Sequence, residues 1–257
     1  MNRVSAVLVR DGARRLCAAA VFLWLPLALF VTSNSARSAA QVSIPSNVAW
    51  TQATLEVASS GDPFRGLLLA RRCDHCHGSE GFSSNPTIPN LAAMDNLTIW
   101  KQLDDFRSDT RTSLEMRAIA SELSSQDSAD LAAYYSMLPI SPDPEDKRAF
   151  PQASPGPAEA AVAARLVTLG DGQRGIPPCQ ACHGPVGYVR GAPSLATQNG
   201  AYIRSQLEGF AGGLRTNDIN MPMRSIAKRL KEEERQALAD YYGAGLGMLP
   251  AGATQPK

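Results

Sequence analysis

The sequence lacks the excess of basic residues that a nucleic-acid-binding protein needs. Lys and Arg number 25, and Asp and Glu number 24, in the whole chain. The segment 1–40 holds five basic side chains and one acidic side chain, so the segment 41–257 has a formal charge of −3. Because affinity for nucleic acid comes chiefly from basic groups that neutralise phosphates, we expect no nucleic-acid partner.

Signals for β-strands are also scarce. Apolar residues instead recur at the helical spacing i, i+4, i+7, which is found at Ile99, Leu103 and Phe106 and again at Ile203, Leu207 and Phe210. The sequence therefore predicts an all-α fold.

The apolar run near the N-terminus is too short to span a bilayer comfortably. It extends from Leu16 to Val31, follows two arginines and contains a proline. Ser38 and Ala40 then provide the small side chains that a signal peptidase requires. This order predicts a signal peptide at 1–40, cleavage after Ala40 and a periplasmic mature protein. An uncleaved membrane anchor is the alternative.

No cysteine is left over once the leader is removed. Cys17 lies in the leader, and the other four cysteines form two Cys-x-x-Cys pairs, each followed at once by a histidine. Cys-x-x-Cys-His is the attachment sequence of c-type haem. The two thiols can bond to the two vinyl groups of one porphyrin, and the adjacent imidazole can meet the iron as proximal ligand. We therefore predict two covalently bound haems c, one on Cys73, Cys76 and His77 and one on Cys179, Cys182 and His183.

Two other sites are known for paired Cys-x-x-Cys motifs. Four such thiols can form a tetrahedral zinc site, and one pair in a βαβ unit can act as a redox-active dithiol. Neither site explains a histidine directly after each pair, so both are weaker interpretations than haem attachment.

The region after each motif repeats with little change, which indicates a tandem duplication. The two copies align almost without gaps, from the attachment motifs to a Tyr-Tyr pair near the end of each copy. Between them, prolines recur in a spacing that stops regular structure. We predict a first cytochrome c domain at 41–138, a Pro-rich linker at 139–157 and a second cytochrome c domain at 158–257.

Several helix ends can be predicted within the copies. Asp62 and Pro63 suit an N-cap followed by the first helical residue, and Ser124-x-x-Asp127 is a capping box. The second copy lacks that box, but three glutamates from Glu232 suit a helix N-terminus.

The distal iron ligands follow from a shortage of histidine. The only histidine outside the two proximal positions is His75, which lies inside the first attachment loop and cannot reach over its own haem. Methionine is the usual alternative. Met116 and Met223 hold the same repeat position, far enough after their histidines for the chain to return on the distal side. We therefore predict that Met116 ligates the first iron and Met223 the second, with Met221 as a rival to Met223.

The proximal histidines need an acceptor for their other ring N–H. Pro89 and Pro193 each begin a repeated Pro-x-Leu that follows the attachment motif, and each has a carbonyl but no N–H to compete. We predict that these carbonyls accept the bond. An ordinary loop proline is the alternative.

These residues resemble class I cytochromes c, and their tandem arrangement is similar to the dihaem cytochrome c4 family. The resemblance covers about 60–257 and is strongest in the second copy, at Pro193-Ser-Leu-Ala, Tyr202-x-x-x-Gln206-Leu207, Arg215-Thr-Asn-Asp218 and Met223-Arg-x-Ile-Ala. It implies two class I domains around a pseudo-twofold axis with facing haem edges. It also implies a location in the periplasm or attached to its membrane face, and electron relay to a terminal oxidase or another acceptor.

Three functions remain open at this level. A dihaem electron carrier requires two six-coordinate irons and supplies only position, potential and docking. An electron-accepting subunit of a periplasmic dehydrogenase would share every motif. A haem enzyme would require an exchangeable ligand or a spare cysteine or histidine, and none remains, so we expect no catalytic residues. In each case the partners are redox proteins, such as a membrane oxidase, a dehydrogenase or a reductase.

Charge is divided unevenly along the chain. Residues 41–150 hold 9 basic and 15 acidic side chains, a formal charge of −6, whereas residues 151–257 hold 11 and 8, a formal charge of +3. Such a dipole can orient the encounter with charged partners. Solvation of both faces without a role in docking is the alternative.

Overall fold

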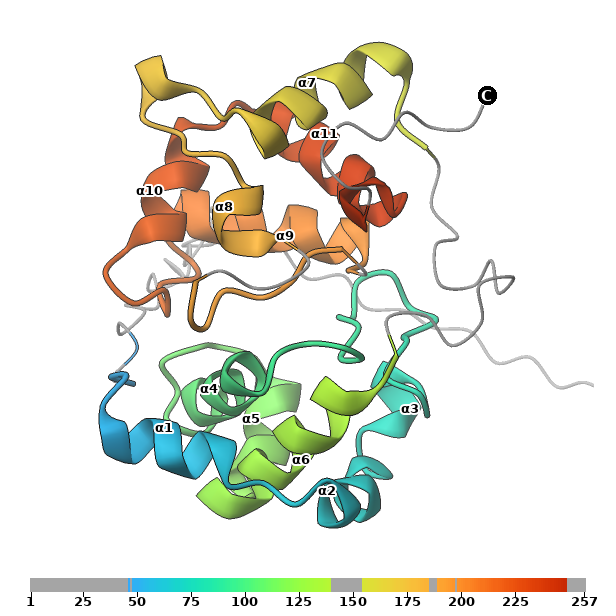
Figure 1. Cartoon of the computed structure of the whole chain (residues 1–257), viewed down its shortest axis with the longest axis vertical. Helices are drawn as coiled ribbons and strands as arrows, with labels where there is room; N and C mark the ends of the chain where they lie inside the picture. The colour runs from blue at the N-terminus through green and yellow to red at the C-terminus, as the bar shows by residue number, and fades with distance from the viewer. Residues whose placement is uncertain (1–45, 47, 140–153, 185–188, 197, 249–257) are drawn as a thin grey trace, which may run out of the picture. The chain divides into compact units, whose positions relative to one another are not determined.

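The structure is a computed structural model that describes residues 46, 48–139, 154–184, 189–196 and 198–248 (Figure 1). These residues all belong to one compact unit. The predicted signal peptide and most of the predicted linker, 139–157, lie outside the described residues. None of the helices in the described ranges is long and apolar enough to cross a membrane.

The described part of the chain is helical and contains no strand, only an isolated bridge between Asp171 and Ile176. The prediction of an all-α fold is therefore confirmed. Each copy places a four-residue helix at its attachment motif and longer helices around it. The first copy holds α1 (Gln52–Ser59), α2 (Pro63–Ala70), α3 (Asp74–His77), α4 (Asn96–Arg107), α5 (Leu114–Ser121) and α6 (Ser125–Met137).

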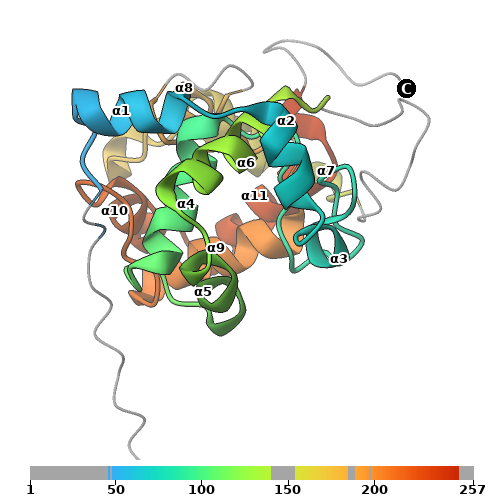
Figure 2. The same cartoon turned by 90° about the horizontal axis from the view of Figure 1, so that it is seen from below.

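Side-chain caps explain where the helices of the first copy begin, with the exception of α3. The Asp62 carboxylate accepts a bond of 2.9 Å from Phe64 N–H at the start of α2. At α6 the Ser124 hydroxyl accepts from Asp127 N–H, while the Asp127 carboxylate accepts from Ser124 N–H, so the predicted capping box is present. Helix α6 packs against α2 and α4, and α1 lies against α6 and α4 (Figure 2).

The second copy repeats this plan. It holds α7 (Pro157–Thr168), the 3-10 helix η2 (Gly172–Arg174), α8 (Gln180–His183), α9 (Gly200–Gly212), α10 (Pro222–Arg229), α11 (Glu232–Gly243) and η3 (Leu246–Met248). At α11 the Glu234 carboxylate accepts a 2.9 Å bond from Lys231 N–H. One half of a capping box is therefore present, although no serine or threonine stands at the N-cap.

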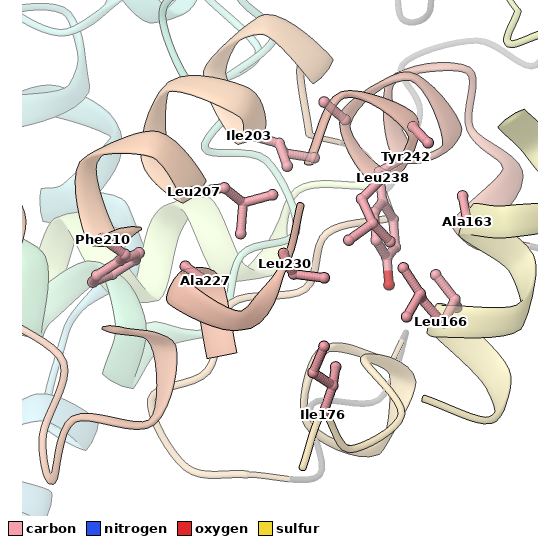
Figure 3. Close-up of a cluster of buried hydrophobic side chains, with 13 residues drawn as sticks. Ala163, Leu166, Ile176, Ile203, Leu207, Phe210, Ala227, Leu230, Leu238 and Tyr242 are labelled. Carbon is pink, nitrogen blue, oxygen red and sulfur yellow. The ribbon is translucent and has the colours of Figure 1, made fainter. Parts of the chain in front are cut away.

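Each copy has its own hydrophobic core. In the second, Ile203, Leu207 and Phe210 lie in a row along α9 and face residues from α7, α10 and α11 (Figure 3). In the first, Ile99 and Phe106 are buried and Leu103 packs against the core. The predicted apolar faces of α4 and α9 are confirmed, and the face of α9 lines the cavity beside the second attachment motif.

Candidate haem sites

Each Cys-x-x-Cys-His motif forms a single helical turn. In the first, Cys76 N–H and His77 N–H donate to the carbonyl of Cys73 at 3.1 and 2.9 Å. In the second, Cys182 N–H and His183 N–H donate to Cys179 at 3.2 and 2.9 Å. The two turns therefore have the same backbone pattern, with a cysteine at the start and a histidine at the end.

A proline carbonyl lies beside each of these histidines. His77 Nδ1 is 2.8 Å from the carbonyl oxygen of Pro89, and His183 Nδ1 is 2.7 Å from that of Pro193. Because a carbonyl can only accept, Nδ1 must hold the proton in each ring and Nε2 keeps its lone pair. Burial lowers the pKa of both imidazoles, although the bonds to Pro89 and Pro193 act in the opposite direction. The lowered pKa favours the neutral imidazole, which is the form that binds a metal.

A cavity of about 280 Å³ adjoins the second motif. Its lining includes Cys179, Cys182, His183 and Met223. Met223 also packs against the core of the second copy, whereas Met221 is 53% exposed. Thus the structure brings the second motif together with Met223.

Met116 holds the corresponding repeat position in the first copy. It lies in α5, is half-buried, and donates its backbone N–H to the Ser113 hydroxyl at 3.3 Å. His75 is exposed inside the attachment turn.

The donor groups fit a covalently bound haem and not the two alternative sites. Burial raises the pKa of the Cys73 thiol, and that of Cys179 to about 11, whereas redox-active dithiols have lowered values. In the described part of the chain, no group of three or more His, Cys, Asp or Glu side chains could hold a metal ion. What remains is a pair of thiols, an imidazole with a free Nε2 and an apolar wall, which suits a porphyrin.

The cavity wall continues into a polar network that joins the two copies. Arg111 donates to Gln102 at 2.6 Å within its own copy and to Gln206 at 2.9 Å in the other. Arg215 donates to Gln206 at 2.7 Å within its own copy and to Gln102 at 3.2 Å in the other. All four side chains line the cavity. Since Gln102 and Gln206, like Arg111 and Arg215, are repeat equivalents, exchanging the copies maps this network onto itself.

Comparison with known proteins identifies the family. The chain is 37% identical over 186 residues to a protein named cytochrome c4 from Thiocapsa roseopersicina, and the match covers 70% of this chain and 91% of that one. The chain belongs to the cytochrome c4 family. This cytochrome is therefore a dihaem c-type electron-transfer protein, and the prediction of two covalently bound haems c is confirmed.

Two further comparisons agree. The cytochrome is 39% identical over 188 residues to a thiosulfate dehydrogenase electron acceptor from Stutzerimonas stutzeri, a match that covers 71% of this chain and 82% of the relative. The crystal structure of reduced cytochrome c4 from Pseudomonas stutzeri superimposes with a TM-score of 0.63 at 33% identity and covers 72% of this chain and 98% of that chain. No protein-family model matches the chain.

The paired arginines of this cytochrome are functional candidates that the motifs alone do not reveal. Each guanidinium carbon lies over a phenylalanine ring of its own copy, Arg111 at 4.6 Å from Phe106 and Arg215 at 4.4 Å from Phe210. The signal in the sequence is an Arg-Thr pair that recurs in both copies. By itself that recurrence indicates duplication and does not identify a site.

The charge of this pair is poorly balanced by the described residues. The nearest carboxylates already have partners, since Asp105 pairs with Lys101 and Asp218 pairs with Arg224. Burial, together with the positive charge of Arg111, lowers the pKa of Arg215 to about 9. Two guanidinium groups that line a cavity and lack a dedicated carboxylate provide a setting for anionic groups.

Proposed function

We propose that this cytochrome is an electron carrier of the periplasm in which both irons are six-coordinate. His77 and Met116 ligate the first iron, and His183 and Met223 ligate the second. Haem iron supplies one-electron chemistry. The protein's part is to fix each imidazole through Pro89 or Pro193 and to surround each haem with an apolar wall.

The observation that carries this proposal is the position of Met223. It lines the same cavity as Cys179, Cys182 and His183. An iron held between His183 and Met223 has no vacant position for a substrate. The chain has one further histidine, His75, and its side chain is exposed.

Arg111 and Arg215 have the chemistry to bind haem propionates. Guanidinium groups recognise carboxylates through paired N–H donors, and these two line the cavity beside the second motif. Propionates would also balance the positive charge of the pair. Because the arginines bond to glutamines of both copies, this role would link the two haem environments.

A carbon monoxide titration tests the proposed coordination. Carbon monoxide binds ferrous haem only where a ligand position is open or exchanges readily. We expect the Soret band of the fully reduced protein to remain unchanged under carbon monoxide. A shift that amounts to one haem per chain would identify an enzyme-like site and overturn the carrier proposal. Met223→Ala is the positive control, because it should free one ligand position on the second iron and allow carbon monoxide to bind there.

The location and domain boundaries belong to the same proposal. The basic, apolar and small-residue order of 1–40 supports export and cleavage after Ala40. We propose domains at 41–138 and 158–257 with the linker between them. N-terminal sequencing of the native protein should begin at Gln41, whereas a blocked or longer N-terminus on a membrane-bound form would indicate the anchor.

A second candidate function is that of an electron acceptor dedicated to one dehydrogenase. The 39% identical relative from Stutzerimonas stutzeri is named as the electron acceptor of thiosulfate dehydrogenase, which favours that enzyme as the donor. Thiosulfate should then reduce this cytochrome rapidly in the presence of catalytic amounts of the dehydrogenase, and the two proteins should co-elute from native extract. Slow reduction and separate elution would contradict a dedicated acceptor and favour a general electron carrier.

A further inference from the structure

The segment before α1 is attached to the first copy. Ser46 Oγ donates to Asp105 Oδ1 at 2.6 Å. The Val48 side chain is buried in the core of the first copy. Thr51 then caps α1, and its hydroxyl accepts from Thr54 N–H at 3.2 Å. These contacts hold Trp50 between two anchored neighbours.

Trp50 also reaches the second copy. It packs against the core of the first copy, yet it lines the cavity that holds Cys179, Cys182 and His183. Its indole ring lies against Gly191, where a Cβ would come within 2.5 Å of Trp50 Cζ2. Gly191 also has φ +76°, which favours glycine. The contact is therefore too close for any larger residue at 191.

The contact occurs next to the group that orients a histidine. Gly191 is two residues before Pro193, whose carbonyl oxygen lies 2.7 Å from His183 Nδ1. Arg190, Gly191 and Pro193 line the cavity together with Trp50. An indole ring that presses on this loop limits where the Pro193 carbonyl can move, and it covers the cavity at the same time.

We propose that Trp50 is a positioning residue for the second haem, provided by the first copy. It holds the loop that orients His183 and keeps water from that edge of the cavity. The second copy contains no tryptophan, since the three in the chain are Trp24, Trp50 and Trp100. No tryptophan of the second copy can therefore give the first haem the same cover, and the two haems of one duplicated chain differ in this respect.

Both effects bear on the reduction potential. Hydrogen bonding to the imidazole and solvent access are recognised determinants of haem potential. Water admitted at the cavity edge stabilises the ferric state, which has the higher charge. Loss of Trp50 should therefore lower the potential of the second haem and leave that of the first unchanged.

The experiment is a redox titration of full-length Trp50→Ala, Trp50→Phe and Val57→Ala. Each haem gives one wave in the titration, and the wave that is missing from a Cys179→Ala/Cys182→Ala variant belongs to the second haem. We expect Trp50→Ala to shift that wave alone, by about a tenfold change in the oxidation equilibrium, which is about 59 mV for one electron. Trp50→Phe, which keeps an aromatic ring at this position, should hold the potential of the second haem close to its natural value. Val57→Ala, at an exposed position on α1, should cause none.

A double-mutant cycle tests the contact itself. Gly191→Ala in the natural protein must displace Trp50, whereas in Trp50→Ala it adds only backbone strain. The combined shift of the second wave should thus be smaller than the sum of the separate shifts. Additive shifts, an unchanged second wave in Trp50→Ala, or equal shifts of both waves would overturn the inference.

This inference rests on the proposed carrier function, but the two can fail separately. The second wave is identified by haem attachment and not by its distal ligand. If carbon monoxide binds the reduced protein, the coordination proposal fails while the effect of Trp50 on the second wave can still be measured.

Discussion

Two methionines separated by one proline compete for the second iron, and local backbone geometry separates them. Asn220 and Met221 both have positive φ, 62° and 63°, and Pro222 then begins α10. This turn leaves Met221 on the surface and directs Met223 to the cavity. Sequence alignment of the copies selects the same residue, on grounds independent of the turn.

Replacement of these methionines should therefore give unequal results. Met223→Ala should abolish one methionine-to-iron charge-transfer band and lower one potential by on the order of 0.1 V, within the about 0.8 V range set by axial ligands. Met116→Ala should do the same for the other haem. Met221→Ala is the matched control and should change neither property. Near-infrared spectra and redox titration measure both, and a larger effect at Met221 would contradict the assignment.

The paired arginines permit a second prediction at the scale of single residues. Arg215→Gln removes a positive charge beside a haem, and a positive charge favours the reduced state because reduction adds an electron. We expect at least one potential to fall by tens of millivolts, about 59 mV being a tenfold change in equilibrium. Arg204→Gln is the control, because Arg204 lies on α9 just before Arg215 but is paired with Glu208 at the surface. Equal potentials in both variants would argue against propionate binding.

The role of a residue was predictable where a short contiguous motif contains all the groups that the site needs. Each attachment turn could be recognised from its own short Cys-x-x-Cys-His sequence. The pairing of Arg111 with Gln206 could not, because the two residues are far apart in the sequence and belong to different copies. Trp50 was missed for the same reason: only the folded chain brings it to Gly191.

At the scale of helices, the two copies offer a matched comparison of N-caps. The Ser124 hydroxyl caps α6, whereas Lys231 occupies the equivalent place before α11 without a side-chain cap. Ser124→Ala should lower the free energy of unfolding by about 1 kcal/mol. Lys231→Ala should have little effect. Urea unfolding followed by circular dichroism measures both, and equal losses would show that the cap bond is not what stabilises α6.

Glu234 leads to a prediction about pH. Its carboxylate accepts from two Arg174 nitrogens at 2.8 and 2.7 Å and from Lys231 N–H. The bonds from Arg174 lower its pKa in the folded state. The stabilisation is therefore complete above the unfolded pKa of about 4.3 and is lost as pH falls through the folded value.

Glu234→Gln should consequently be less stable than the natural protein at pH 7, with the difference shrinking towards pH 3. Thermal unfolding at intervals between these values measures it. Glu233→Gln, a neighbouring exposed glutamate, provides the comparison. A difference that stays constant with pH would mean that the ion pair with Arg174 adds nothing.

Helices were predictable where their ends have chemical signals. Asp62, Pro63, Ser124 and Asp127 mark α2 and α6, and the apolar faces of α4 and α9 follow from spacing. Helix α1 was not predicted, because Thr51 is its only clear end signal. Its place depends on packing against α4 and α6, which local sequence does not reveal.

For the whole molecule, the uneven charge of the two copies predicts a dependence on salt. Residues 41–150 have a formal charge of −6 and residues 151–257 one of +3. Stopped-flow reduction by a cationic and an anionic agent should respond to ionic strength in opposite directions, as salt screens the field over a Debye length of about 10 Å at 0.1 M. A neutral reductant is the control. Reduction rates that do not change with ionic strength would show that the charge difference has no role in docking.

The crossed bonds between arginines and glutamines bear on the origin of the molecule. Each copy contributes one arginine and one glutamine to the contact, and the same surface of each copy faces the other. The two subunits of an isologous dimer meet in this way. A covalent connection makes such pairing independent of protein concentration. The tandem chain thus has the arrangement that fusion of an ancestral homodimer would leave. Once fused, the two copies no longer had to stay identical, and one of them could acquire a tryptophan that serves the other.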